Sequence, residues 1–190
     1  MLRLLLCAAC AATIGNLALR CDAGERSKRS GTPDVPVTVR LIEADWKGVQ
    51  KLGAAQKGKV VVVDVWTSTC AACVKKFPRF AALQKKHGNK VACISVNCDF
   101  DGVPGKPPKH YRKHVLDFLR KQQASFDNVM LNVPFLGFLN QIKLESTPAL
   151  FVYDKTGRLT KRFDNDKSVS DADDFTMKQV ESLVESLITR

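Results

Sequence analysis

The chain has 190 residues, of which 45% are hydrophobic and 26% are charged. These values are typical of a globular protein and exclude a disordered, collagen-like or coiled-coil chain. The 30 Lys and Arg residues outnumber the 19 Asp and Glu residues, giving a formal net charge of +11. This excess predicts attraction to an acidic protein or an anionic membrane surface. We expect no nucleic-acid partner, because the sequence has no nucleic-acid-binding motif.

The amino terminus has the pattern of an export signal. An apolar run over residues 4–19 follows Arg3, and residues 21–23 (Cys-Asp-Ala) form a small-x-small cleavage pattern. The run is short for a bilayer span. We therefore expect a signal peptide over residues 1–23 and a location in the periplasm or cell envelope. An uncleaved or lipid-modified anchor and a buried helix are the alternatives.

A flexible basic linker is predicted over residues 24–36. This segment, GERSKRSGTPDVP, is rich in Gly, Ser, Pro and charge and has almost nothing to bury. One folded domain is then expected over residues 37–190.

From residue 37 the pattern alternates between strands and helices. Predicted strands cover residues 37–41, 60–66, 91–97, 129–132, 149–153 and 158–163, and predicted helices cover 43–56, 70–86, 108–124 and 134–142. A last helix is expected to start at the Ser170-x-x-Asp173 capping box. Between the last two strands, residues 154–157 (Asp-Lys-Thr-Gly) give the strongest hairpin signal. A βαβ start followed by a helix-linked hairpin predicts an α/β fold, a central mixed β-sheet flanked by helices.

A Cys-x-x-Cys motif, Cys70 to Cys73, directly follows a predicted buried strand. It begins the next predicted helix, where backbone N–H groups and the helix dipole favour an anion. A thiolate at Cys70 can attack a disulfide, and a thiol at Cys73, one turn along, can resolve the mixed disulfide. The motif therefore predicts a redox pair, with a structural metal site and inert packing as the alternatives.

The surrounding segment VVVDVWTSTCAACVKKFP, residues 61–78, resembles the thioredoxin superfamily in its order of strand, aromatic residue and active-site motif. Pro78 lies where that family kinks the active-site helix. Residues 146–149 (Ser-Thr-Pro-Ala) resemble the segment that carries the family's cis-proline, for which a simple strand-entry turn is the alternative. The resemblance implies a thioredoxin-like fold over most of residues 37–190.

The resemblance also implies roles for single residues. Asp64 would be the buried carboxylate that takes a proton from Cys73, while Trp66, Thr147 and Pro148 would bind the substrate. Burial in an apolar strand raises the pKa of a carboxyl group, which suits a base near neutral pH. The alternative for Asp64 is a polar residue with an ordinary partner. No cofactor and no metal are implied.

Two departures from the family pattern leave the reduction potential open. Thr69 stands where the family has Trp, and Ala72 stands where it has Pro. The lack of a His between the cysteines favours a reductant. The stretch from Asp99 to Glu145 holds an insertion, a helix plus a short strand, before the cis-proline strand. With the export signal, this insertion resembles the TlpA/ResA-like envelope thioredoxins, which implies disulfide reduction outside the cytoplasm.

Two further cysteines, Cys93 and Cys98, fall on one predicted strand. They would point to opposite faces with α-carbons about 16 Å apart, too far for a disulfide. We expect buried free thiols, with Cys98 as a third thiol at the active site as the alternative. His110 and His114 have i, i+4 spacing, but no carboxylate or Cys adjacent in the sequence completes a metal set. A solvated basic helix face is expected there.

The sequence therefore predicts an exported thiol–disulfide oxidoreductase that acts as a protein disulfide reductase. We expect a monomer that needs a disulfide-containing protein substrate and an upstream thiol electron donor. Two alternatives stay open: a non-catalytic thioredoxin-fold binding module with a basic surface, and a copper or zinc carrier using the Cys-x-x-Cys pair.

Overall fold

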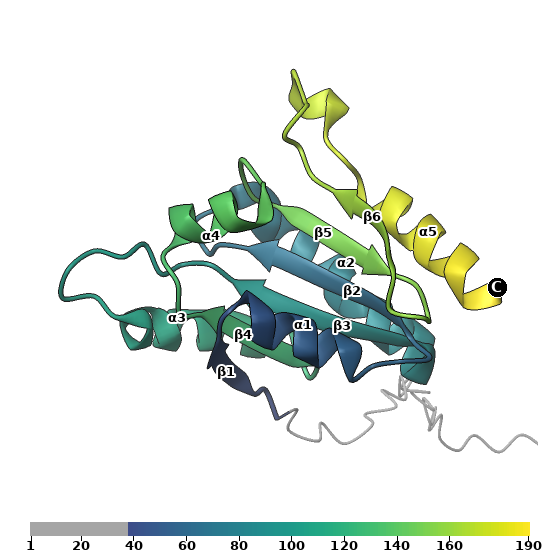
Figure 1. The fold of residues 1–190 in the computed structure, drawn as a ribbon, viewed down its shortest axis with the longest axis horizontal. Helices are drawn as coiled ribbons and strands as arrows, with labels where there is room; N and C mark the ends of the chain where they lie inside the picture. Colours follow the sequence, from purple (N-terminus) through teal and green to yellow (C-terminus); the bar gives the residue numbers. More distant parts are fainter. Residues whose placement is uncertain (1–37) are drawn as a thin grey trace, which may run out of the picture. The chain divides into compact units, whose positions relative to one another are not determined.

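A six-stranded mixed sheet lies at the centre of residues 38–190, the part of the chain that this computed structural model describes (Figure 1). The predicted signal peptide and linker lie outside the described residues. The strands are β1 (Leu41–Ala44), β2 (Val60–Trp66), β3 (Val91–Asn97), β4 (Asp127–Leu131), β5 (Ala149–Tyr153) and β6 (Leu159–Phe163), in the order β1-β4-β3-β2-β5-β6. The strands β1, β4, β3 and β2 are parallel to one another, whereas β5 is antiparallel to β2 and β6 is antiparallel to β5.

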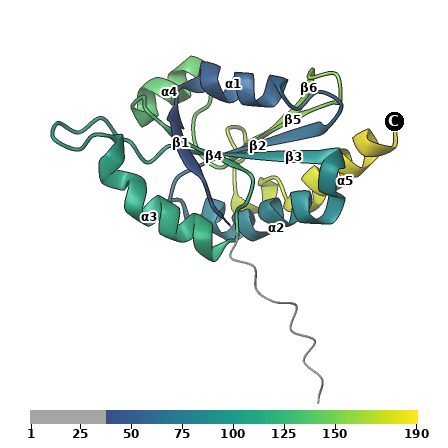
Figure 2. The same cartoon turned by 90° about the horizontal axis from the view of Figure 1, so that it is seen from below.

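Helices cover both faces of the sheet, as the sequence pattern predicts (Figure 2). They are α1 (Trp46–Ala54), α2 (Ala71–His87), α3 (Pro108–Lys121), α4 (Phe135–Ile142) and α5 (Met177–Thr189). Apolar side chains of α2, α3 and α5 share one hydrophobic core with alternate residues of the sheet, and those of α1 and α4 share a second core on the other face. The strands β2 and β3 are buried along their whole length because both of their faces are covered. This confirms an α/β thioredoxin-like fold.

The first strand and helix differ from their predicted bounds. The strand runs over Leu41–Ala44 instead of 37–41, in parallel register with β4. The helix begins only at Trp46, because the side chain of Asp45 accepts a 2.8 Å hydrogen bond from Gly48 N and caps it. The capping residue Asp45 therefore sets the start of this helix.

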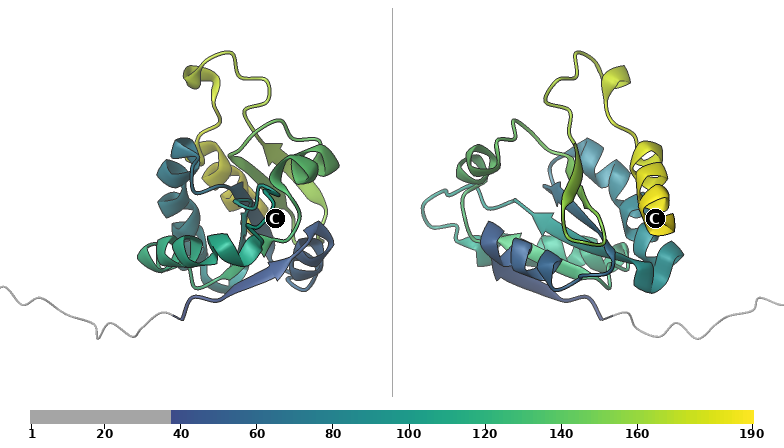
Figure 3. Two further views of the ribbon diagram at one scale, coloured as in Figure 1. Left: turned by 90° about the vertical axis from the view of Figure 1, so that its left-hand side faces the viewer. Right: turned by 45° about the vertical axis from the view of Figure 1, so that its right-hand side comes forward.

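The start of the last helix was also predicted wrongly. The Ser170–Asp173 capping box is present, but it caps a 3-10 helix of a single turn, η2 (Asp171–Asp173). The chain then becomes extended, and a second box, formed by Thr176 and Gln179, starts α5. Figure 3 shows the connection from β6 to α5, including η2, projecting beyond the sheet. Two capping boxes in succession therefore separate a short turn from the true helix.

The predicted hairpin between β5 and β6 is confirmed. The Asp154 carboxylate accepts hydrogen bonds from the backbone N–H groups of Thr156, at 2.9 Å, and Arg158, at 3.1 Å. Gly157 has a φ of +86°, which glycine adopts without steric cost. The Thr156 hydroxyl also donates a 2.6 Å hydrogen bond to this carboxylate. That bond, more than the two backbone bonds, lowers the pKa of Asp154 to about 2.

The two edge strands of the sheet are short, and each carries at least one charged side chain. β1 has four residues, and β6 has five, of which Leu159, Thr160 and Lys161 are exposed. Arg162 next to them forms ion pairs with Asp164 and with Asp166, the latter at 3.3 Å. Charged side chains on short edge strands oppose pairing with another chain.

Candidate active site

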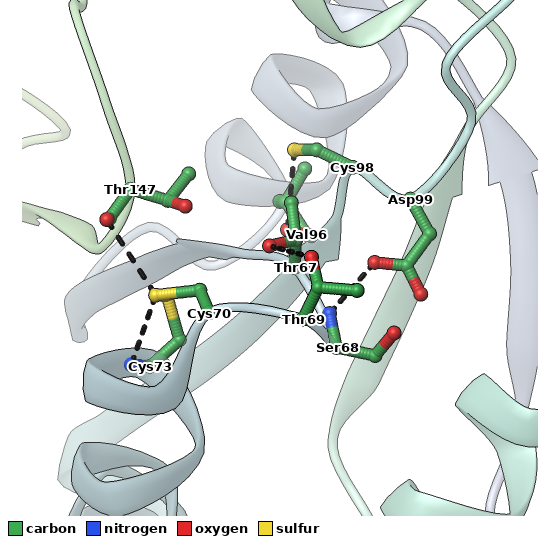
Figure 4. The surroundings of a disulfide bond; sticks show 9 residues. All are labelled: Thr67, Ser68, Thr69, Cys70, Cys73, Val96, Cys98, Asp99 and Thr147. Carbon is green, nitrogen blue, oxygen red and sulfur yellow. Dashed lines mark hydrogen bonds between the residues drawn. A yellow bond between two sulfur atoms is a disulfide. The ribbon is translucent and has the colours of Figure 1, made fainter.

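A disulfide between Cys70 and Cys73 lies where β2 ends and α2 begins (Figure 4). Cys70 is the N-cap residue of α2, and its sulfur accepts a 3.1 Å hydrogen bond from the backbone N–H of Cys73. Cys70 is half-buried, whereas Cys73 is only 2% exposed. The more accessible sulfur is therefore the one that the start of the helix stabilises as an anion.

The segment before β5 faces this disulfide. The Thr147–Pro148 peptide bond is cis, as the resemblance implied. The carbonyl oxygen of Thr147 lies 3.5 Å from Cys70 Sγ (Figure 4). The structure thus brings together Cys70, Cys73, Thr147 and Pro148, which come from two distant parts of the sequence.

Asp64 lies on β2, beneath the start of α2. Its strand neighbours Val62 and Trp66 point into the same core as Cys73, and the Asp64 side chain alternates in step with them. The residue is 3% exposed. Burial raises the pKa of Asp64 to about 8, and the charge of Lys76 counteracts this in part. A carboxyl group with such a pKa can exchange protons near neutral pH.

The side chain of Trp66, for which the resemblance implied a substrate-binding role, is fully buried. Its indole Nε1 donates a 2.8 Å hydrogen bond to Ser95 Oγ on β3. Its ring packs against Phe77 of α2 and Phe118 of α3, with centroids 5.1 and 4.8 Å away. Trp66 therefore supports the active-site helix from below, and a substrate cannot contact it here.

Sequence reasoning missed the role of two residues close to the disulfide. The carboxylate of Asp99, just after β3, accepts a 2.7 Å hydrogen bond from Ser68 N, two residues before Cys70 (Figure 4). The other oxygen of Asp99 lies 2.8 Å from Nε2 of His114 on α3. His114 was predicted on a solvated helix face, which is a partial error because this carboxylate, distant in sequence, partners its ring.

Parallel register offers a signal that could have revealed this contact. β2 and β3 are parallel neighbours, with Trp66 opposite Asn97. Residues that follow these strands, such as Ser68 and Asp99, therefore meet at one edge of the sheet.

Cys93 and Cys98 are free, buried thiols, as predicted. Cys93 belongs to the core under α2, and Cys98 belongs to the core on the opposite face. Burial raises the pKa of both thiols well above the ordinary value. Cys98 lines a cavity of about 300 Å³ that also reaches Thr69, beside Cys70, but it is only 1% exposed. This environment favours an unreactive thiol.

Within residues 38–190, no group of three or more His, Cys, Asp and Glu side chains is placed to hold a metal ion. In the same part of the chain, no helix is long and apolar enough to cross a membrane.

The model of the Redoxin family matches residues 34–176. The chain belongs to the Redoxin family. With the Cys70–Cys73 pair at the start of α2, it is a Redoxin-family thiol–disulfide oxidoreductase. A comparison with curated proteins gives no match.

Solved structures with the same fold include three bacterial proteins. A putative thiol:disulfide interchange protein DsbE from Chlorobium tepidum has a TM-score of 0.51 and 20% identity, covering 71% of this chain and 84% of that one. A secreted Mycobacterium tuberculosis disulfide oxidoreductase, described as homologous to E. coli DsbE, has a TM-score of 0.52 and 16% identity, covering 70% and 86%. A thiol-disulfide isomerase from Corynebacterium glutamicum has a TM-score of 0.52 and 20% identity, covering 72% and 85%. At these identities the likeness concerns the fold.

Proposed function

We propose that this Redoxin-family protein is an exported protein disulfide reductase. The observation that carries the proposal is the unequal placement of the two active-site sulfurs. Cys70 is accessible at the N-cap of α2, whereas Cys73 is buried directly behind it. An attacking thiol must reach a large substrate, but a resolving thiol needs to reach only the first sulfur.

In the reduced protein, the Cys70 thiolate attacks one sulfur of a substrate disulfide. A Cys70–substrate mixed disulfide forms, and the second substrate sulfur leaves as a thiolate that takes up a proton. Cys73 then loses its proton and attacks Cys70 Sγ, which releases the first substrate sulfur. Two electrons pass from the cysteine pair to the substrate, and the Cys70–Cys73 disulfide remains. An upstream dithiol donor must return those two electrons before the next cycle.

Asp64 is proposed to accept the proton of Cys73. The carboxylate form is a stronger base than an ordinary aspartate because burial raises its pKa to about 8. It is also the minor form at pH 7. We therefore expect the resolution step to speed up as the pH rises towards 8.

Thr147 and Pro148 are proposed to contact the substrate polypeptide next to its disulfide. Support comes from the position of the Thr147 carbonyl, 3.5 Å from the sulfur that attacks. A substrate disulfide that reaches Cys70 must approach along this segment.

The direction of electron flow is proposed from the groups around the sulfurs. The residues between the cysteines are Ala71 and Ala72, which bring no charge and no side-chain hydrogen bond to Cys70. Strong oxidants of this type have a stabilised reduced form, because their thiolate is stabilised. Fewer stabilising groups at Cys70 favour a more reducing pair.

Export is proposed from the apolar run over residues 4–19 and the cleavage pattern over residues 21–23. The mycobacterial protein of the same fold, described as secreted, supports an extracytoplasmic setting. Mass spectrometry of the amino terminus of the cell-associated protein tests this part directly, since cleavage would leave Gly24 as the first residue.

The reductase proposal is tested by the reduction potential of the Cys70–Cys73 couple. The full chain is equilibrated in dithiothreitol or glutathione buffers, and the state of each cysteine is read by alkylation and peptide mapping. A couple near or below about −250 mV supports a reductase, and one near about −120 mV indicates an oxidase. Cys70→Ser is the control, since it cannot form the couple. If the wild-type couple never forms, the redox function fails, and the binding-module and metal-carrier alternatives are next to test.

A further inference from the structure

A buried carboxylate ties the loop before Cys70 to the inserted helix α3. The Asp99 side chain is 4% exposed, and both of its oxygens have partners. Oδ1 accepts the 2.7 Å hydrogen bond from Ser68 N, and Oδ2 lies 2.8 Å from His114 Nε2. The Ser68 hydroxyl is also 3.2 Å from the same ring nitrogen. Three segments distant in sequence therefore meet at one polar cluster.

Hydrogen bonds connect this cluster to the turn from which Cys70 projects. Cys70 N donates a 3.3 Å hydrogen bond to Thr67 O, which closes the turn that leads into α2. Ser68 lies inside that turn, and Asp99 holds its N–H. Charge-assisted hydrogen bonds to backbone N–H groups are stronger than neutral ones, so Asp99 fixes the turn from which Cys70 projects.

The cluster also carries charge beside the turn that leads to Cys70. A carboxylate disfavours a second negative charge nearby, so Asp99 alone opposes the Cys70 thiolate. His114 Nε2, 2.8 Å from Asp99 Oδ2, counters that charge when its ring is protonated. The net charge that the Asp99–His114 pair presents to the Cys70 thiolate therefore depends on whether His114 is charged.

We propose that Asp99 and His114 are positioning residues whose opposing charges set how readily the Cys70 thiolate forms. The inference rests on the proposed function, because it assigns Cys70 as the attacking thiol. It links the inserted segment that carries α3 to the redox pair.

Other titratable groups face the same place. Asp101, after β3, accepts a 2.6 Å hydrogen bond from Tyr111 OH, and the Tyr111 ring centroid is 6.2 Å from that of His114. The thiol of Cys98 lines the adjoining cavity. Burial keeps Cys98 protonated, and the Asp101 carboxylate has Tyr111 as its partner, so Asp99 and His114 are the pair tested below.

The test compares three single variants of the reduced full chain: Asp99→Asn, His114→Gln and His110→Gln. Asn and Gln keep hydrogen-bonding capacity at their positions while removing charge. His110 is one helical turn from His114 and has no side-chain hydrogen bond, so it is the matched control. The rate of iodoacetamide alkylation at Cys70 is followed from pH 5 to 9 by quenching and peptide mapping, with circular dichroism as a check of folding.

We expect opposite effects from the two members of the pair. His114→Gln lowers the Cys70 alkylation rate and Asp99→Asn raises it, each about two- to tenfold, as expected for the removal of one neighbouring charge. His110→Gln leaves the rate unchanged within about 1.5-fold of the wild type, a change smaller than any single-charge effect. Both effects shrink in 1 M salt, because the His114 side chain is 51% exposed.

Effects of both variants in the same direction would indicate simple loss of structure and would overturn the inference, as would no effect from either. If Asp99→Asn does not fold, the comparison of His114→Gln with His110→Gln decides the matter. Alkylation needs no substrate, so this test stands apart from the proposed function. A wild-type chain that fails to reduce insulin disulfides would refute the reductase proposal without changing the alkylation result.

Discussion

The sulfur of Cys70 lies 3.5 Å from the carbonyl oxygen of Thr147, which is 77 residues later in the chain. In the proposed reaction, a substrate disulfide reaches this sulfur beside the segment before β5. Cys73 is 2% exposed and cannot be reached from outside in this conformation. In the proposed reaction, Cys70 is therefore the sulfur that meets the substrate and Cys73 is the one that resolves the mixed disulfide.

Cys73→Ser should trap substrate proteins as mixed disulfides through Cys70, because the thiol that would release them is gone. Trapped species are detected on non-reducing gels and mapped to Cys70 by mass spectrometry. The double variant Cys70→Ser/Cys73→Ser is the control and should trap nothing. Recovery of no adducts from a folded Cys73→Ser protein would contradict the mechanism.

Asp64→Asn should make the protein more stable at high pH. The folded-state pKa of Asp64 is about 8, above its model-peptide value of 3.8. The folded state therefore binds more protons than the unfolded state between about pH 4 and pH 8, and stability falls as the pH rises through this window. Asparagine has no charge to bury, so the gain should be near zero at pH 4 and reach about 3–5 kcal/mol above pH 8.

Urea denaturation of the oxidised protein at several pH values measures this gain. Asp127→Asn, at a partly exposed position on β4, removes a carboxylate from the same sheet and serves as the comparison. A gain that does not grow between pH 5 and pH 8 would show that Asp64 is not held protonated.

The same Asp64→Asn variant should slow resolution of the mixed disulfide. General base catalysis by a side chain contributes about 10²- to 10⁴-fold, and the loss should lie near the lower end because hydroxide competes at high pH. Stopped-flow release of thiol from a preformed Cys70 adduct measures this step. In the wild type its rate should rise with pH and level off above about 8, and this inflection should vanish in the variant. An unchanged profile would remove Asp64 from the proton path.

Ser95→Ala should destabilise the fold by about 1–3 kcal/mol, because it leaves the buried indole N–H of Trp66 without its acceptor. Thermal or urea unfolding followed by tryptophan fluorescence measures the loss. Ser182→Ala, at an exposed position of α5, should change stability by less than about 0.5 kcal/mol. Equal effects of the two substitutions would mean that the Trp66–Ser95 hydrogen bond contributes nothing.

Cys93 and Cys98 should react with alkylating reagents at least about 100-fold more slowly than Cys70 in the folded, reduced protein, because burial raises their thiol pKa values and blocks access. Peptide mapping after timed alkylation separates the three. Cys98→Ser should leave insulin reduction unchanged, and a clear loss from a folded variant would revive Cys98 as a third redox thiol.

The central strands could be predicted to the residue. β2, β3 and β5 are short, mostly apolar runs that are buried along nearly their whole length, so each stands out clearly in the sequence. The first and last helices were misplaced because hydrophobic spacing does not identify which of several polar residues caps a helix. Only the hydrogen bonds of Asp45 and Thr176 decide this.

Some residues of the candidate site could likewise be predicted from the sequence, and others could not. The positions of Cys70, Cys73 and Pro148 follow from local motifs, so the sequence was sufficient to predict them. The sequence did not indicate that Trp66 is buried, because an aromatic residue close to a site in the sequence can be either exposed or buried. The burial of Trp66 depends on its contacts with Phe77 and Phe118. The contact of Asp99 with His114 joins a strand end to an inserted helix, and local spacing carries no information about such a pair.

The short, charged edge strands restrict how a substrate can be held. Many proteins bind an extended peptide by adding it as a further strand to an exposed sheet edge. Here β1 offers only four residues, and β6 presents Lys161 and Arg162. For the disulfide substrates proposed above, binding energy would then come from the area around Cys70 and Thr147, and contact with so few residues would suit rapid release of many different disulfides in turn.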